Sequence, residues 1–168
     1  MNKEASDNQP WFGEASPKDE LRTLQLIRVG SLQFGVFAGD VATIVPWREP
    51  TPLPHAPKGV LGVVSIQGRM LTVLDLAVLA NGETVSSGVV LDSDRRIVAL
   101  RGEEQLALAV DAAGDIVRIS SADVKPGPDS GALVLGSLQL EDSEINILNL
   151  RDLFPAAIQG RERRRRRF

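Results

Sequence analysis

Short apolar runs separated by turn residues begin at Leu24 and continue through most of the chain. No stretch of about 11 to 18 residues keeps the period of an amphipathic helix, whereas many runs have the length and residue types of strands. The sequence therefore predicts a mainly β fold. The expected strands are Leu24 to Val29, Leu32 to Phe37, Val60 to Ile66, Met70 to Leu76, Val89 to Leu91, Ile97 to Leu100, Leu106 to Val110, Ile116 to Ile119, Leu133 to Leu140 and Ile145 to Leu150.

Short helical turns are expected at three places between or after these strands. Asp40 can cap a turn that continues to position 45 and places Val41 and Ile44 on one side. A second turn is expected over residues 76–80. A third is expected immediately before Pro155, which should stop it because its ring is incompatible with a helix interior.

Five prolines lie between positions 46 and 57. Each proline lacks a backbone donor and drives the residue before it toward extended geometry. This segment should therefore cross the fold in an extended conformation without regular pairing.

The chain contains an internal repeat. Residues 60–79 (VLGVVSIQGRMLTVLDLAVL) align without gaps with residues 134–153 (VLGSLQLEDSEINILNLRDL), a shift of 74 positions, and share the Gly, the turn and the closing apolar element. A weaker echo relates the segment that starts at Phe34 to the one that starts at Leu106. We interpret this as a duplication, because such small β units would be marginal alone and should pack on one another across an apolar seam.

Composition and charge limit the class of protein. The sequence has no Cys and one His, which excludes disulfide scaffolds, thiol nucleophiles and Cys-ligated metal sites. There are 19 Lys and Arg against 22 Asp and Glu, and six of the Arg lie in the last eight residues. An acidic body with a basic tail does not resemble a nucleic-acid-binding domain, whose basic residues gather on a folded face.

The ends of the chain differ from its centre. Residues 1–20 are polar, with Trp11 and Phe12 as exceptions, and are expected to form a mobile arm. Residues 21–155 are expected to form the folded domain and residues 156–168 an Arg-rich tail. The start lacks the order of a secretory signal, and no apolar run approaches the roughly 20 residues of a membrane helix, so we expect a cytoplasmic protein without membrane insertion.

Candidate catalytic and ligand-binding residues do not form a convincing site. Ser65, His55 and Asp75 could be written as a triad, but Ser65 lies within a strand and not on a G-x-S-x-G elbow. Asp92 and Asp94 are spaced as in a calcium loop that then lacks its next ligand and its Gly. Phosphate-binding Gly motifs are absent. We therefore expect no enzyme activity, no metal and no cofactor, and expect Asp75 and Asp111 to accept backbone donors.

The order of these motifs resembles the CheW-like domain family over residues 24–153. The features that carry the resemblance are a first hairpin, a V-x-x-I pattern at Val41 and Ile44, a crossing that ends LPHAP, the segment GVLGVVSIQGRMLTVLDL, the LALAVD strand with GDIVRI after it, and VLGSLQLEDSEINILNL. The resemblance implies two SH3-like β-barrel subdomains packed around a shared hydrophobic core. It also implies a scaffold that links a chemoreceptor tip to the regulatory domain of a CheA-type histidine kinase. In this family like barrels pair edge to edge, and the receptor helix docks in a groove between the subdomains.

The chain departs from the family pattern at three positions. The N-L-R-G turn of the family is Ser65-Ile66-Gln67-Gly68 here, so a neutral amide replaces a charged planar group, and Arg69 follows two positions on. Thr43 occupies an acidic position, and Asn149 replaces the closing Asp of the second repeat. These departures predict a divergent member of the family, and a non-flagellar output such as twitching motility is one alternative.

The expected binding surface is an apolar strip with a polar rim. Its residues are Val36, Val41, Ile44 and Gly62 in the strip, with Gln67, Gly68 and Arg69 at the rim. An alternative function is a β-barrel module that binds polyanions through the Arg-rich tail.

Overall fold

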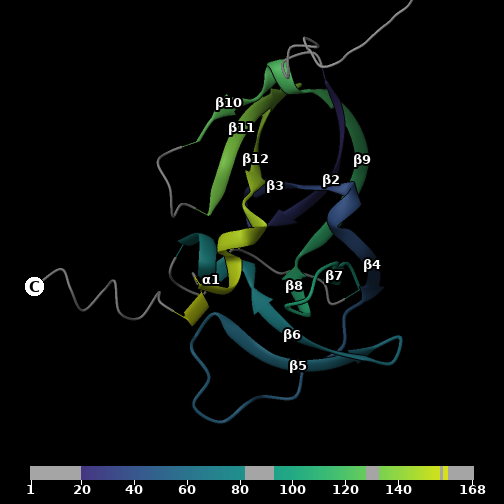
Figure 1. The fold of residues 1–168 in the computed structure, drawn as a ribbon, viewed down its shortest axis with the longest axis vertical. Coiled ribbons are helices and arrows are strands. Elements are labelled where there is room, and N and C mark those ends of the chain that lie inside the picture. The colour runs from purple at the N-terminus through teal and green to yellow at the C-terminus, as the bar shows by residue number, and fades with distance from the viewer. Residues whose placement is uncertain (1–19, 82–92, 128–132, 156, 159–168) are drawn as a thin grey trace, which may run out of the picture.

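The structure, a computed structural model, describes residues 20–81, 93–127, 133–155, 157 and 158. These residues form two β-sheets, which lie one above the other in Figure 1. The predicted strand at 89–91, nearly all of the predicted arm and most of the predicted tail fall outside the described residues. Within the described part, no helix is long and apolar enough to cross a membrane.

The upper sheet in Figure 1 has six strands in the order β10-β11-β12-β3-β2-β9. All neighbours in this sheet are antiparallel except β12 and β3, which run parallel. The strand bounds are β2 Leu21–Val29, β3 Leu32–Phe37, β9 Ala112–Ser120, β10 Lys125–Pro126, β11 Val134–Leu140 and β12 Ser143–Leu148.

The lower sheet has five strands in the order β4-β7-β8-β6-β5, and its single parallel pair is β6 and β8. The bounds are β4 Val41–Pro46, β5 Val60–Ile66, β6 Arg69–Asp75, β7 Arg96–Leu100 and β8 Leu106–Val110. The short helical elements include η2 Ala38–Asp40, α1 Leu76–Asn81, η3 Ser121–Asp123 and η4 Leu150–Asp152, and residues 153–155, 157 and 158 are also helical.

The prediction of a helical turn over 40–45 is wrong, because residues 41–45 lie in strand β4 and Asp40 is the last residue of η2, the short helix before this strand. Val41, Thr43, Ile44 and Val45 are β-branched, and such side chains favour a pleated strand over a helix. A bulge between Val41 and Thr43 nevertheless keeps Val41 and Ile44 on the same side. Both pack against the largest apolar core, which lies between the two sheets and which we call the central core. The predicted pairing of these two side chains is therefore right, although the element that produces it is different.

Two other local predictions need correction. Pro155 does not stop the last helical turn, because residues 153–155, 157 and 158 are helical. A proline near the start of a helix is tolerated there, since its missing N–H has no intrahelical partner. No helix or strand is predicted between Ile119 and Leu133, yet this stretch contains η3 and the two-residue strand β10, which pairs with β11.

The repeat appears in the structure as two matching hairpins. β5 and β6 correspond to β11 and β12, and both hairpins carry a bulge at the same place, between Val60 and Gly62 and between Val134 and Gly136. The match extends to the segments before each hairpin. Thr51 forms a bridge with Val63, and Lys125, 74 positions after Thr51, pairs with Ser137 in the same way.

The two halves of the chain are interleaved, which differs from the expectation of two separate units that pack on each other. Each parallel pair joins one half to the other, with Thr72 beside Leu106 in the lower sheet and Asn146 beside Phe34 in the upper sheet. The first half thus contributes β2 and β3 to the upper sheet, and the second half contributes β7 and β8 to the lower sheet.

Three groups of apolar side chains fill the fold. The largest lies between the sheets and includes Phe34 and Val36 from the upper sheet and Leu74 and Leu108 from the lower one. A second group lies within the lower sheet unit and a third within the upper one. The mainly β fold with two subdomains around a shared hydrophobic core is therefore confirmed.

Candidate protein-binding groove

A groove of about 540 Å³ lies where the two sheet units meet, and we call it the inter-sheet groove. Its apolar lining comes from both units: Phe37, Leu100, Leu106, Leu135, Leu148 and Leu150. Its charged lining residues are Asp40, Arg101, Glu103, Glu104 and Arg151. An apolar floor with a charged rim has the general character of a protein-binding surface.

One wall of the groove is the turn between β7 and β8, residues 101–105. The backbone N–H of Arg101 donates to the carbonyl oxygen of Asp40 at 2.8 Å, which ties this turn to η2. The N–H of Thr72 donates to the carbonyl of Gln105 at 2.9 Å and fixes the other end. The turn is thus anchored on both sides, and the exposed side chains of Glu103 and Glu104 stand at its tip.

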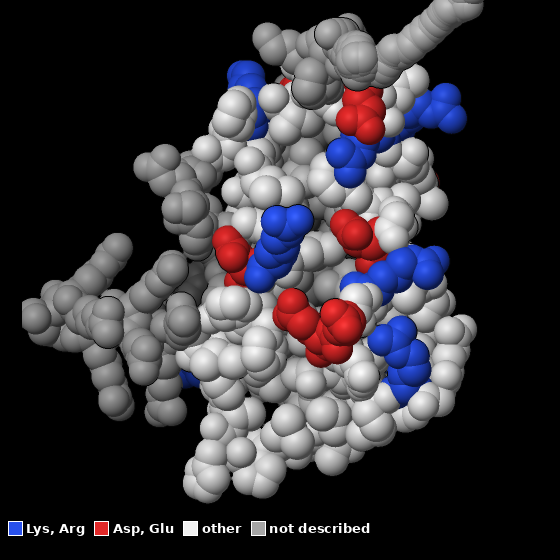
Figure 2. Space-filling model, in the orientation of Figure 1, with Lys and Arg blue, Asp and Glu red and all other residues white. Residues whose placement is uncertain are grey.

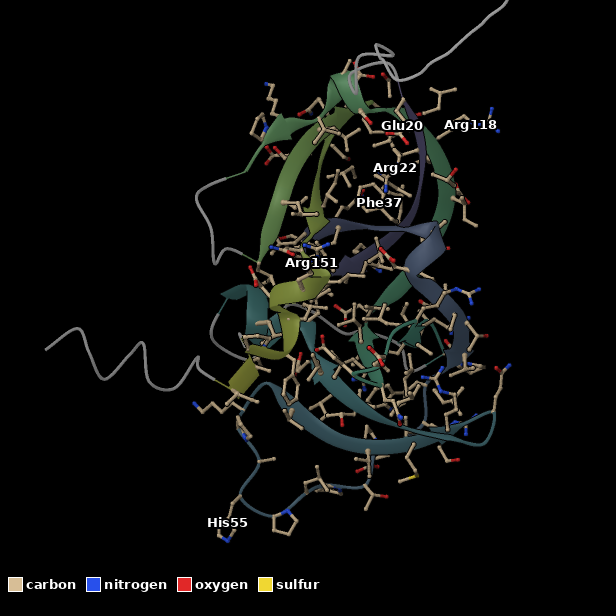
Figure 3. All side chains as sticks on the ribbon, in the orientation of Figure 1. Glu20, Arg22, Phe37, His55, Arg118 and Arg151 are labelled. Atoms are coloured by element: carbon tan, nitrogen blue, oxygen red, sulfur yellow. The ribbon has the colours of Figure 1, made fainter. Side chains whose placement is uncertain are left out.

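The opposite wall comes from β11 and η4. The N–H of Asn149 donates to the carbonyl of Leu133 at 2.7 Å, and the Asn149 side-chain amide donates to Oδ2 of Asp152 at 2.9 Å. The first bond joins the residue before η4 to the residue before β11, and the second closes the η4 turn. Leu135 is half exposed at 50%, and Arg151 is exposed on the face shown in Figure 3.

Charges of both signs lie on this face. Figure 2 shows acidic and basic side chains interspersed over the region between the two sheets, with white surface between them. An amphipathic helix can place its apolar stripe on such a floor and its polar flanks on the rim, which is the helix-in-groove mode of recognition.

Two of the predicted strip residues are not available to a partner. Val36 is 0% exposed within the central core. Gly62 is buried, and a Cβ there would collide with the Thr51 carbonyl. Val41 and Ile44 are half-buried and pack on the central core, and Val41 directly follows the groove residue Asp40.

The three predicted rim residues lie together at the tip of the β5–β6 hairpin. Gln67, Gly68 and Arg69 are all exposed, and Met70 beside them is 57% exposed. Gln67 and Gly68 have φ of 52° and 79°, the positive values of a type I′ turn. Neither the hairpin tip nor any of the four predicted strip residues lines the inter-sheet groove, so the predicted binding surface and the groove are different parts of the molecule.

The candidate catalytic residues have other roles or positions. His55 is exposed on the proline-rich loop at the bottom of Figure 3. The Asp75 carboxylate accepts from the N–H groups of Ala77 at 3.0 Å and Val78 at 3.4 Å, so it caps α1. Burial raises the pKa of Asp75 above its usual value of 3.8. Asp111 accepts at 2.7 Å from the N–H of Gly30, which lies in the β2–β3 turn.

Among the described residues, no group of three or more His, Asp or Glu side chains could hold a metal ion. The predicted structural roles of Asp75 and Asp111 as acceptors of backbone donors are confirmed. The donor to Asp111, the N–H of Gly30, lies 81 positions earlier in the chain.

Sequence reasoning missed the groove residues on the 101–105 turn, Leu135 and Arg151. The local signal is the alternation along strand β11. Gly136 and Leu138 point to the buried side, so Leu135 falls on the other, exposed side. That signal is weak, because single exposed leucines are common on protein surfaces.

Known proteins share both the sequence pattern and the fold. The family model described as "CheW-like domain" matches residues 23–157. The chain is 33% identical to "Chemotaxis protein CheW" of Rhizobium meliloti over 144 residues, which cover 80% of this chain and 88% of that protein. It is 28% identical to "Probable chemotaxis protein CheW" of Rhizobium etli over 141 residues, covering 79% of this chain and 87% of the other.

Among solved structures, the scaffolding protein TtCheW from Thermoanaerobacter tengcongensis matches with a TM-score of 0.70. The match covers 80% of this chain and 93% of that one at 23% sequence identity, so it supports the fold alone.

Proposed function

Since this chain belongs to the CheW-like domain family, we propose that it is a non-catalytic adaptor that couples a chemoreceptor to a CheA-type histidine kinase in the cytoplasm. The family match over residues 23–157 carries this proposal. The matched range also supports residues 21–155 as the functional domain. The two Rhizobium relatives are named as chemotaxis proteins, and this chain matches 88% and 87% of their lengths.

The inter-sheet groove is our candidate for the receptor contact. A receptor tip is helical in the family pattern, and the groove offers an apolar floor between charged rims. Asp40, Glu103 and Glu104 outnumber Arg101 on one rim and make it net acidic, whereas Arg151 stands on the opposite wall. A helix with basic residues toward the 101–105 turn would fit this distribution.

The β5–β6 hairpin tip is our candidate for the second contact, with Gln67, Gly68 and Arg69 as its residues. Its surface combines the exposed Met70 with Arg69, and the Arg48 guanidinium reaches this hairpin by donating to the carbonyl of Ser65 at 3.0 Å. Methionine and arginine are both enriched at protein interfaces. This surface is separate from the groove, as an adaptor with two partners requires.

Binding to receptor and kinase fragments tests the proposal. We expect purified protein to bind both a receptor tip fragment and a CheA regulatory domain, measured by calorimetry. The double variant Glu103→Arg and Glu104→Arg should weaken receptor binding at least about fivefold, which corresponds to ~1 kcal/mol, because two rim charges are reversed. Glu141→Arg with Asp142→Arg, an exposed acidic pair on the β11–β12 turn outside the groove, is the matched control.

Absence of binding to both fragments would refute the adaptor proposal. If both pairs of substitutions weaken receptor binding equally, the effect is net charge, and the groove is not the receptor site. The Arg-tail polyanion module receives no support from the comparisons. Deleting residues 161–168 separates it from the adaptor, because the adaptor should retain kinase binding.

A further inference from the structure

A second hollow of about 260 Å³ lies on the upper sheet beside the inter-sheet groove, and we call it the upper hollow. Phe37 and Leu135 line both spaces, so the hollow borders the groove directly. An apolar cavity of about 150 Å³ holds a benzene molecule, so the upper hollow has room for one aromatic side chain. Its other lining residues are Arg22, Ile119, Ser121, Val124, Pro126 and Ile147.

The internal repeat gives the upper hollow a counterpart in the lower sheet unit. At the shift of 74 positions that relates the two hairpins, Ser121 corresponds to Trp47. The backbone N–H of Trp47 donates at 3.2 Å to the carbonyl of Arg95, the residue immediately before β7. The N–H of Ser121 donates at 2.9 Å to the carbonyl of Glu20, the residue immediately before β2. The two residues therefore hold equivalent places. The same shift pairs three further lining residues with lower-unit residues: Ile119 with Val45, Leu135 with Leu61 and Ile147 with Val73.

The counterpart in the lower unit contains an aromatic ring. Trp47 and Leu61 pack against the second apolar group. The Arg95 guanidinium lies 3.7 Å from the centre of the Trp47 ring, which is a cation–π contact. In the upper unit Ser121 has no ring, and Leu135 is 50% exposed whereas Leu61 is half-buried. The upper hollow thus lies where the lower unit places an indole.

The walls of the upper hollow also have the chemistry of the Trp47 site. Arg22 lines the hollow, and its guanidinium lies 4.0 Å from the centre of the Phe37 ring; Figure 3 shows the two side chains together in the upper sheet. A guanidinium is attracted to the face of an aromatic ring, and most strongly to that of Trp. Apolar walls with one guanidinium therefore favour a planar aromatic group over an aliphatic or charged one.

We propose that the upper hollow binds an aromatic side chain carried by the helix that occupies the inter-sheet groove. This inference rests on the proposed function, which places a receptor helix in that groove. A side chain that projects from the helix between Phe37 and Leu135 enters the hollow, because these two residues form the border of both spaces. Buried aromatic anchors of this kind contribute a large share of the binding energy of protein interfaces.

Titration of the full chain with N-acetyl-tryptophan amide tests whether the hollow accepts a ring. In methyl NMR spectra we expect the resonances of Ile119, Leu135 and Ile147 to shift, because a bound indole changes the field at neighbouring methyl groups. Leu61 and Val73, the counterparts in the lower unit, should not shift and are the internal control. N-acetyl-leucine amide at the same concentration should cause much smaller shifts. Absence of shifts at the hollow, equal shifts in both units, or equal shifts with both amides would overturn the proposal.

Ser121→Trp gives the upper unit the residue that the lower unit has, and it should fill the hollow. We expect this variant to lose the shifts caused by N-acetyl-tryptophan amide and to bind the receptor tip fragment at least about tenfold more weakly, because a central anchor is excluded. Ala122→Trp is the matched control, since Ala122 is exposed and does not line the hollow. Equal losses in the two variants, or no loss in either, would contradict the assignment of the hollow.

Failure of this inference and failure of the proposed function give different results. The amide titration of the wild type needs no receptor, so it reads the hollow even if no receptor fragment binds, which would refute the proposed function. If the receptor fragment binds the wild type and Ser121→Trp equally well, the function stands and the receptor does not use the hollow. Val124→Phe, at a residue that lines the hollow and not the groove, is the second filling variant if Ser121→Trp does not fold.

Discussion

Gly62 must be a glycine because the backbone of another segment, at Thr51, lies directly against it. Its φ is 148°, and a Cβ there would collide with the carbonyl of Thr51, which is bonded to Val63 in both directions at 2.8 and 2.9 Å. We expect Gly62→Ala to lower the free energy of unfolding by at least about 2 kcal/mol in urea denaturation, because it adds both strain and a clash.

The control for Gly62→Ala is Gly39→Ala, at a position where a Cβ would meet nothing within 4 Å. This change should stay within about 0.5 kcal/mol of the parent. Equal stability of the two variants would show that the Thr51 segment can move away at little cost.

Asp75 is the residue whose ionisation should affect stability. Burial raises its pKa in the folded state, so the folded protein holds this proton more tightly than the unfolded chain does. The contribution of Asp75 to stability therefore falls as the pH rises from about the usual value of 3.8 through the raised pKa, and stays low above it. Asp75→Asn keeps an oxygen for the Ala77 N–H and removes the buried charge.

We expect Asp75→Asn to unfold at a higher urea concentration than the parent at pH 7, with the difference vanishing below about pH 4. The reciprocal variant is Asn149→Asp at the repeat-related position. It should destabilise the protein at pH 7, because the Asn149 amide that donates to Asp152 would become a second carboxylate. A parent that is more stable than Asp75→Asn at pH 7 and equal to it at pH 4 would contradict the argument.

At the scale of the elements, the β5–β6 hairpin depends on its turn. Ile66 pairs with Arg69, and both residues between them have positive φ, which is the type I′ geometry that favours Asn followed by Gly. We expect Gln67→Asn to raise the free energy of unfolding by about 0.5 kcal/mol and Gln67→Val to lower it by about 1 kcal/mol, because a β-branched residue resists this conformation. Thermal unfolding midpoints check both, and the same sign for the two changes would refute the turn assignment.

At the scale of the whole molecule, the interleaved sheets make the two halves of the chain interdependent. Each sheet contains a parallel pair that joins the halves, and the central core draws side chains from both. We expect fragments 1–92 and 93–168 to be unfolded alone by circular dichroism and to gain β structure when mixed in equal amounts. A fragment that folds cooperatively by itself would show that a half is an independent unit.

Most strands could be predicted from the sequence, because short apolar runs between turn residues depend on neighbouring positions only. Leu32–Phe37, Val60–Ile66 and Leu106–Val110 have the expected bounds. The error at 40–45 arose because Asp40, Val41 and Ile44 fit a capped helical turn as well as a bulged strand. The β-branched residues of this segment favour the strand, and pairing with β7 provides its hydrogen-bond partners. The binding site was predicted less well. Apolar and small residues such as Val36 and Gly62 occur both in binding surfaces and in cores, and in the structure these two residues are buried.

The sequence by itself determined the β class, the duplication and the lack of a convincing catalytic constellation, because these follow from residue types and their spacing. The tertiary structure decided which half supplies each strand, because parallel pairs such as β6 with β8 join residues 34 positions apart that no local pattern connects. It also decided where surfaces form. The inter-sheet groove, for example, is lined by Phe37 and Leu135, which are 98 positions apart in the sequence and meet only when the sheet has formed.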